Sequence, residues 1–239
     1  MVFNLVTLFP RFYECLDHYG VVTRARDKGL LEFRVEDLRA HGLGAHKKVD
    51  DTVYGGGAGM LFRPEPVASA LRAVDPEKKS RVILFSAAGA PFTQDLAREF
   101  ALLPAITLIA AHYEGVDARI RDAFGATEIS VGPYVLSGGE SAALIVLDAV
   151  ARLFQGVVGK GEESTGPESF SVPSVGGGAL LEHDHFTKPA VWEGREVPGV
   201  LLSGNHGEIA RWRREESIRK TAATRPEMMR AHLSVGGIS

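Results

Sequence analysis

Three short, glycine-containing stretches of the sequence each follow an apolar run and could bind a ligand: residues 86–89, 112–115 and 132–139. The third belongs to a longer segment that breaks at Gly132 and Pro133, crosses Gly138 and Gly139, and then enters a long helix with an apolar face. Glycine lets the backbone approach a ligand closely, and a helix N-terminus presents N–H groups without helical partners. The pattern indicates a ligand held mainly by main chain, although ordinary strand–loop–helix connections also carry such glycines.

The common nucleotide-binding and nucleophile motifs do not account for these stretches. The first apolar run is followed by Pro10 and Arg11 instead of the glycine turn of the Rossmann fingerprint. The sequence contains no Walker A motif, no G-x-S-x-G elbow, and no early glycine-rich motif of the kind used by the common class of methyltransferases. The three stretches therefore require a different kind of site.

The apolar runs predict the elements that position these stretches. From Arg81 onward, a strand, a loop and a helix follow one another three times, with Thr93 at an N-cap position. Near-continuous apolar strands are typical of a parallel sheet covered on both faces, so we expect an open α/β sheet with its site at the carboxyl edge. Strands are expected at 2–8, at 31–38 and from 81, 105 and 127. Helices are expected at 11–28 with a break near Gly20, at 64–74, 93–102 and 116–124, and from 140. No regular element can span the glycine-dense stretch 46–66, which is expected to be a tight functional loop or a flexible excursion.

Composition limits the class of protein. The 239 residues are 45% hydrophobic and 24% charged, and Cys15 is the single cysteine, which excludes a disulfide framework within the chain and a cysteine-rich zinc site. No apolar run reaches the length of a membrane span, and the start of the chain lacks the pattern of a signal peptide, so we expect no membrane partner and a cytoplasmic location. Because the net charge is −3, any RNA contact would need a local basic patch.

The chain changes character after Phe154. Residues 155–179 are rich in Gly, Ser, Pro and Glu, a linker composition, and the sequence that follows holds turn signals and then a helical stretch. We therefore expect an α/β domain over residues 1–160, a linker over 161–179 and a smaller helical domain over 180–239.

Two clusters in this C-terminal part could bind a partner or an ion. Residues 205–232 carry seven Lys or Arg against four Glu, which makes Arg211, Arg214 and Lys220 candidate RNA contacts; the alternative is a solvated helix with intrahelical ion pairs. His183 and His185 flank Asp184, but three donors without a fixed fourth ligand are more typical of polar surface, so no metal site is expected.

Four segments carry a resemblance to a known family. HYEGVDARI, SVGPYVLSGGE, VLLSGNHGEIARWRREESIRKT and the upstream VDDTVYGGGAGM resemble bacterial tRNA (guanine-N1)-methyltransferases of the SPOUT superfamily, in the family's order and over nearly the whole chain. The resemblance implies an α/β domain with a trefoil knot, a small helical C-terminal domain, a homodimer, S-adenosyl-L-methionine as methyl donor and guanine at tRNA position 37 as acceptor. A magnesium dependence stays open.

The resemblance also implies which residues form the site. Three departures from the family pattern lie at its rim: Ala110-Ala111-His112 in place of Cys-Gly before Tyr-Glu-Gly, Pro133 in place of Asp, and Ala87-Ala88 in place of Pro-Gln. The implied cofactor-binding residues are Leu84, Phe85, Ser86, Gly89, Ala111, Tyr113, Glu114, Gly115, Val131, Gly132, Tyr134, Leu136, Gly138 and Gly139.

For catalysis, the resemblance implies Glu168 as the general base and Arg152 as the residue that holds the guanine or stabilises its charge. An insertion at residues 173–179 lies close to Glu168, and Glu162, Glu163 and Glu182 are rival acids. Arg152 could instead pair with Asp148 one helical turn earlier. Two other functions stay open: ribose 2′-O-methylation, and RNA binding without catalysis.

Overall fold

The computed structural model describes residues 1–18, 20–56, 59–158, 168–173 and 179–229. The chain divides into two compact units, residues 1–159 and 160–239. The expected linker 161–179 therefore lies mostly outside the described residues.

A five-stranded sheet forms the centre of the first unit. Its strands follow the order β2-β1-β6-β5-β7, and every neighbouring pair is parallel. This confirms the predicted parallel α/β sheet, because the near-continuous apolar runs in β1 and β6 are buried. The strands are β1 (Val2–Thr7), β2 (Glu32–Asp37), β5 (Arg81–Pro91), β6 (Ala105–Ile109) and β7 (Thr127–Ser130).

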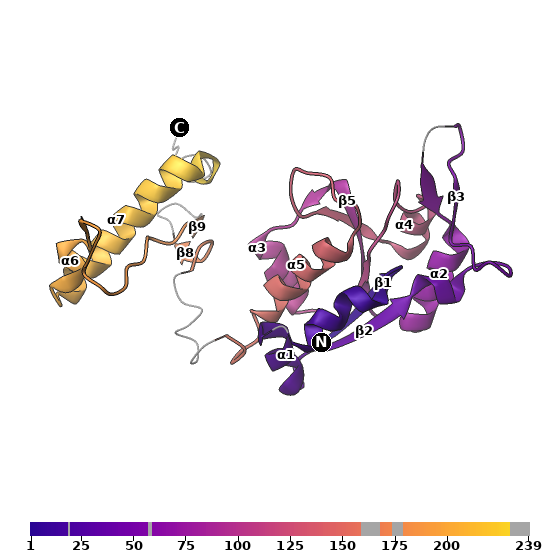
Figure 1. Ribbon diagram of the computed structural model, residues 1–239, viewed down its shortest axis with the longest axis horizontal. Coiled ribbons are helices and arrows are strands. Elements are labelled where there is room, and N and C mark those ends of the chain that lie inside the picture. The colour runs from indigo at the N-terminus through magenta and orange to yellow at the C-terminus, as the bar shows by residue number, and fades with distance from the viewer. Residues whose placement is uncertain (19, 57–58, 159–167, 174–178, 230–239) are drawn as a thin grey trace, which may run out of the picture. The chain divides into compact units, whose positions relative to one another are not determined.

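Helices cover both faces of this sheet, and each layer has its own apolar core (Figure 1). One core packs the 3-10 helix η1 (Pro10–Asp17) and helices α1 (Gly20–Asp27), α3 (Gln94–Ala101) and α5 (Glu140–Ala151) against the sheet. The other core holds the 3-10 helix η2 (Leu38–His41), α2 (Pro64–Val74) and α4 (Arg119–Phe124). The sheet is thus covered on both faces, and its strand ends are left for the loops that build the site.

Local sequence explains where several helices begin and end. The Thr93 hydroxyl accepts a hydrogen bond from the Leu96 N–H at 3.2 Å and caps α3, as predicted. Pro64 opens α2, and Gly125 ends α4 with φ = 60°. The predicted helix 11–28 is interrupted before Gly20, as expected, but its first half is a 3-10 helix.

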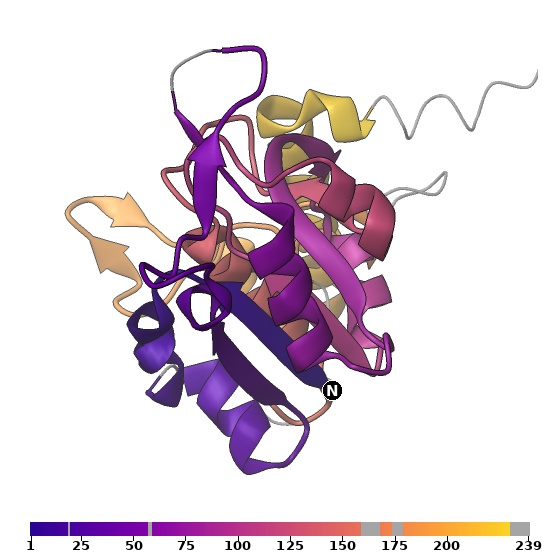
Figure 2. The same cartoon turned by 90° about the vertical axis from the view of Figure 1, so that its right-hand side faces the viewer.

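No single regular element spans the stretch 46–66, but it holds two short strands that the sequence did not indicate. The structure has a short antiparallel pair there, β3 (Asp50–Thr52) and β4 (Met60–Phe62), which projects from the first unit (Figure 2). Tertiary contacts supply what local propensity lacks: Phe62 is 1% exposed, and its N–H donates to the Gly115 carbonyl at 2.9 Å.

The second unit is built around α7 (His206–Thr224), which occupies the stretch expected to be helical. The Asn205 side chain caps it by accepting from the Glu208 N–H at 3.3 Å, and α6 (Gly199–Leu202) precedes it. Two antiparallel strand pairs that the sequence did not indicate also occur there: β8 (Val172–Pro173) with β9 (Ala179–Leu180), and β10 (Val191–Trp192) with β11 (Arg195–Glu196). None of the helices that the structure describes is long and apolar enough to cross a membrane.

Candidate functional site

Three loops at the carboxyl edge of the sheet enclose a cavity of about 430 Å³. The loops are residues 86–89, an irregular stretch within β5, residues 111–115 after β6, and residues 131–139 between β7 and α5. Thirteen of the fourteen expected cofactor residues line this cavity, and Gly89 does not. The thirteen are Leu84, Phe85, Ser86, Ala111, Tyr113, Glu114, Gly115, Val131, Gly132, Tyr134, Leu136, Gly138 and Gly139.

The first loop arises from an interruption of the strand ladder. Phe85 and Ala90 both pair with Ile129, so residues 86–89 leave the ladder between them. Gly89 lies where the chain returns, and a Cβ there would be 2.6 Å from the backbone of Ile129. Gly89 therefore lets β5 approach β7 and forms the loop without lining the cavity.

The second loop holds Tyr113 in a left-handed conformation, with φ = 59°. Non-glycine residues with positive φ are uncommon and occur where surrounding contacts fix the backbone. Those contacts come from β4, since the Glu114 N–H donates to the Met60 carbonyl at 3.0 Å and the Phe62 ring meets the Tyr113 ring edge-on. Burial raises the pKa of the Tyr113 hydroxyl, and a hydrogen bond to Asp50 and the charge of Asp50 raise it further.

The third loop folds over itself before it enters α5. The Tyr134 ring covers Gly132, where a Cβ would be 2.3 Å from the ring, and its hydroxyl donates to the Val131 carbonyl at 3.2 Å. The Gly139 N–H donates to the Ala111 carbonyl at 2.9 Å, and a Cβ on Gly139 would be 2.7 Å from the Cα of Ala110. The glycine pair thus allows the second and third loops to touch through backbone.

A buried chain of hydrogen bonds supports the contact between these two loops, and the sequence analysis missed it. Glu140, which is 4% exposed, accepts from the Thr7 hydroxyl at 2.7 Å through Oε1 and lies 2.7 Å from His112 Nε2 through Oε2. The His112 ring lies over Gly138, where a Cβ would be 2.3 Å from ring atoms. His112 also lines the cavity, so this chain joins the cavity wall to the end of β1.

The polar side chains of the cavity give it an acidic character. Glu114 and Glu128 line it, and the described lining residues include no Lys or Arg. Arg121 lies 3.5 Å from Glu128 but does not itself line the cavity. Carboxylates without a lining cation favour a ligand that carries positive charge.

The two expected catalytic residues belong to different units, and neither is among the described residues that line this cavity. Arg152 is the C-cap of α5, thirteen residues after Gly139 at the start of that helix, so about 20 Å of helix separates them. Glu168 belongs to the second unit, where its carbonyl accepts from the Ser171 N–H at 2.9 Å. Of the rival acids, Glu182 is described, whereas Glu162 and Glu163 lie outside the described residues.

The three candidate RNA contacts lie on α7 in different surroundings. Arg211 and Arg214 are exposed, whereas Lys220 pairs with Asp184. On the same helix Arg219 pairs with Glu216, which holds the pKa of that carboxyl below its usual range. Part of the basic charge of α7 is thus already balanced within the unit.

The fold and the cavity define an α/β protein with a cavity between three loops at the carboxyl edge of a parallel sheet, the general position of ligand sites in such sheets. The chain belongs to the family described as tRNA (Guanine-1)-methyltransferase TrmD, whose model matches residues 1–231.

Three relatives agree with this assignment, and each is named tRNA (guanine-N(1)-)-methyltransferase. The protein of Chloroflexus aggregans is 45% identical over 238 residues, which cover 99% of this chain and 90% of that protein. The protein of Caldicellulosiruptor saccharolyticus is 41% identical over 231 residues, with 97% and 91% covered. The protein of Oleidesulfovibrio alaskensis is 44% identical over 230 residues, 96% of this chain but 52% of that longer protein.

Proposed function

We propose that this chain transfers a methyl group from S-adenosyl-L-methionine to N1 of guanine at position 37 of tRNA, next to the anticodon. The observation that carries the proposal is the three-loop cavity, whose lining offers carboxylates and backbone groups but no cation among its described residues. Family membership names the acceptor class, because the family and its relatives are described as tRNA guanine-N1 methyltransferases.

The residues of the cavity fit this methyl donor. Its sulfonium and ammonium groups are positive, which suits Glu114 and Glu128, and the volume of about 430 Å³ lies in the usual range for small-molecule sites. Backbone groups of the three loops would bind the adenine edge, while Tyr134 and Leu136 supply apolar walls. When bound, S-adenosyl-L-methionine supplies an electrophilic methyl group.

The chain's own residues must handle a proton. The N1 atom of guanine carries a hydrogen that has to leave as the new bond forms, and a carboxylate within hydrogen-bond reach is a suitable acceptor. We assign this role to Glu168, with Arg152 holding the base and stabilising the negative charge that develops on it. Glu182 is the described alternative to Glu168.

The separation of Arg152 from its own cavity supports a homodimer with composite sites. About 20 Å of α5 lies between Arg152 and Gly139, so a second copy of the chain has to bring an Arg152 to each cavity. Exposed apolar side chains in the first unit, including Phe9, Phe12 and Ile145, offer surface that such an interface would bury.

The knot is also part of the proposal. After β7 the chain hydrogen-bonds to the second loop at Ala111 and then continues as α5, which packs against α1 and α3. We propose that the segment after β7 passes through a loop formed by earlier residues, which would make this path a knot.

We further infer that residues 1–160 are the catalytic domain, 161–179 the linker and 180–239 the tRNA-binding domain, acting in the cytoplasm. Arg211, Arg214 and Lys220 would contact phosphates, which makes tRNA affinity fall with salt. Lys220 would have to exchange Asp184 for a phosphate.

The test is methylation of an unmodified tRNA transcript that carries guanine at position 37, followed by mass spectrometry of the nucleosides. We expect 1-methylguanosine, and its loss when position 37 is changed to adenine. A 2′-O-methylated nucleoside would instead show ribose methylation. Tight tRNA binding without a methylated product would show an RNA-binding protein without catalysis.

A further inference from the structure

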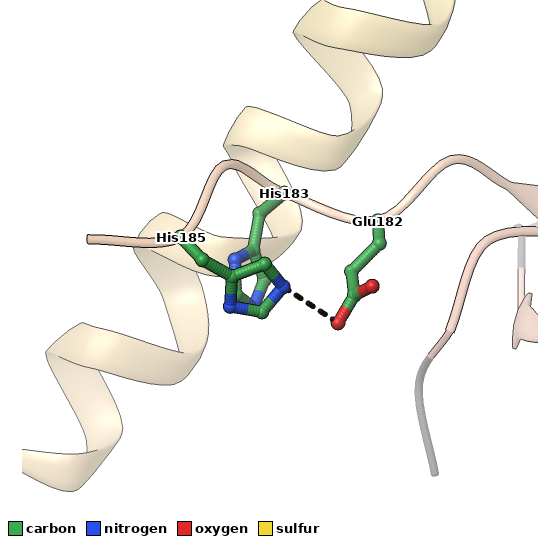
Figure 3. A group of neighbouring side chains, drawn as sticks. All are labelled: Glu182, His183 and His185. Carbon is green, nitrogen blue, oxygen red and sulfur yellow. Dashed lines mark ion pairs between the residues drawn. The ribbon is translucent and has the colours of Figure 1, made fainter. Parts of the chain in front are cut away.

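A cluster of three potential metal ligands lies in the second unit, on the segment between β9 and β10. The ligand atoms of Glu182, His183 and His185 all lie within 4.8 Å of one another (Figure 3). The Nε2 atom of His185 is 2.8 Å from Oε1 of Glu182, and the two imidazole rings lie 4.6 Å apart between centroids. Two imidazoles and one carboxylate form a ligand set that zinc accepts in proteins.

The orientation of His183 prepares one ring nitrogen for an ion. Its Nδ1 lies 3.0 Å from the backbone carbonyl of Asp184, and this contact requires Nδ1 to donate its hydrogen. In the neutral imidazole this arrangement leaves the lone pair on Nε2, as in most metal-binding histidines, which donate their other N–H to a carbonyl or carboxylate. His183 is 8% exposed and its ring packs 6.1 Å from that of Trp212, so its orientation is held by packing.

Contacts on both sides of the cluster hold the backbone that carries it. The Leu181 N–H donates to the Thr221 hydroxyl of α7 at 2.9 Å, and the Glu182 N–H donates to the Ser169 hydroxyl at 3.0 Å. Asp184 turns to Lys220, which keeps its carboxylate away from the three donors. Ligands on a fixed backbone lose little conformational freedom when an ion binds.

The cluster opens onto space that a fourth ligand can use. A second cavity of about 440 Å³ is lined by His183, His185, Trp212 and other residues of the same unit. Zinc sites with three protein ligands keep their fourth position for water or another oxygen ligand, and this cavity provides the room. Magnesium prefers an octahedral set of oxygens, and two imidazoles do not match it.

We propose that Glu182, His183 and His185 bind one zinc ion, with the fourth position open to the adjoining cavity. The ion would bind both the Glu182 carboxylate and His185, whose Oε1 and Nε2 atoms now lie 2.8 Å apart. Ligands bound at about 2.1 Å in a tetrahedral site lie about 3.4 Å apart, so side-chain rotations of about an ångström complete the site. The proposal does not rest on the methyltransferase function: none of these residues lines the three-loop cavity, and although Glu182 is also the alternative to Glu168 as general base, zinc binding is measured without tRNA or methyl donor.

The sequence analysis expected no metal site, since no fourth ligand is fixed. The structure supplies two features that the sequence does not show. The carbonyl contact of His183 sets the tautomer that an ion needs, and the neighbouring cavity supplies the open position.

The first test is calorimetric titration of the full-length, chelator-treated protein with zinc chloride. We expect one zinc ion per chain, an affinity that decreases as the pH is lowered, and a loss of at least about tenfold in Glu182→Gln and in His185→Asn. His206→Asn, at the start of α7 and outside the cluster, is the matched control and should bind like the wild type. His183→Asn should also lose zinc affinity. Because His183 is buried and its replacement could disturb folding, the variants at the half-exposed Glu182 and the exposed His185 are the ones that test the site.

A second measurement uses cobalt chloride as a spectroscopic probe. We expect the intense visible absorption of tetrahedral cobalt in the wild type and in His206→Asn, and its loss in Glu182→Gln. The proposal is overturned if the wild type shows no zinc binding, or if Glu182→Gln and His185→Asn bind zinc as tightly as His206→Asn does. Saturable binding of magnesium chloride at the same residues would equally contradict a zinc site.

Discussion

Glu140 joins the cavity wall to the first strand through partners that no local pattern links to it. Thr7 lies 133 positions earlier in the chain, and His112 lies 28 positions earlier. From the sequence alone, Glu140 was only the first residue of a helix, where a carboxylate is common because it faces the positive end of the helix dipole. The three-dimensional approach of β1, the second loop and α5 gives it a different role.

Replacing Glu140 by Ala should destabilise the fold. The Thr7 hydroxyl loses a buried acceptor and His112 loses its partner, so we expect the free energy of unfolding to fall by about 1–3 kcal/mol. Urea denaturation followed by circular dichroism measures this. Glu14→Ala, on an exposed ion pair with Arg11, is the control and should change stability by less than about 0.5 kcal/mol. Equal effects of the two substitutions would show that the buried chain contributes nothing.

Replacing Gly139 by Ala should abolish binding of S-adenosyl-L-methionine. The added Cβ would lie 2.7 Å from the Cα of Ala110, so the second and third loops would have to separate at the cavity. Titration calorimetry measures the affinity, and circular dichroism checks that the variant is folded. Gly199→Ala meets nothing within 4 Å and is the matched control. Wild-type affinity in Gly139→Ala would contradict the assignment of the cofactor to this cavity.

At the scale of elements, the loops are shaped by contacts between elements. Residues 86–89 leave the ladder because Phe85 and Ala90 pair with one residue of β7, and residues 114–117 are held by β4. Asp117 belongs to this arrangement: its N–H donates to the Phe62 carbonyl, and its carboxylate accepts from the backbone and side chain of Arg119 at the start of α4.

The Asp117 pair should make stability depend on pH in the acid range. The hydrogen bond from Arg119 lowers the pKa of Asp117 in the folded state, with a backbone hydrogen bond acting in the same direction. A carboxyl whose pKa is lower in the folded state stabilises the fold at pH values above its unfolded-state pKa of about 3.9. This stabilisation is lost as the pH falls through the folded-state pKa. Asp117→Asn should therefore be less stable than the wild type at pH 7, by about 1 kcal/mol, and the difference should shrink below about pH 4. A difference that stays constant with pH would contradict this.

The sequence predicted the elements better than it predicted their contacts. Apolar runs identified the parallel strands, and Thr93, Pro64 and Gly20 marked helix boundaries, because these signals act within a few residues. The strands β3 and β4 were missed, since Asp-Asp-Thr in β3 has weak strand propensity and Met-Leu-Phe in β4 is only three residues long, so their antiparallel pairing defines them. Glycines marked the three cavity loops in the sequence, and the family resemblance named their cofactor-binding residues. The buried hydrogen bond of His112 and the position of Glu128 in the cavity wall needed the structure.

At the scale of the whole molecule, the proposed site needs two copies of the chain. Arg152 lies about 20 Å along α5 from Gly139 of its own chain, so each complete site would combine a cavity from one copy with an Arg152 from the other. A homodimer in light scattering at micromolar concentration is the first expectation.

Mixed dimers test this arrangement more sharply. Gly139→Ala and Arg152→Gln should each be inactive alone. When the two variants are coexpressed, half of the dimers are mixed. Each mixed dimer holds one intact cavity and one intact Arg152, on opposite copies of the chain. We therefore expect about a quarter of the wild-type methylation rate. If Arg152 acted on the cavity of its own chain, the mixed dimers would have no intact site and the mixture would stay inactive.

The most direct test of the central claim is hydrogen–deuterium exchange with and without S-adenosylhomocysteine, the product of the methyl donor. The claim is that the three-loop cavity, and not the second cavity at residues 183–213, binds the cofactor. We predict slower exchange in residues 84–89, 111–115 and 131–139, with residues 183–213 unchanged. Protection confined to residues 183–213, or protection nowhere at saturating ligand, would contradict the account.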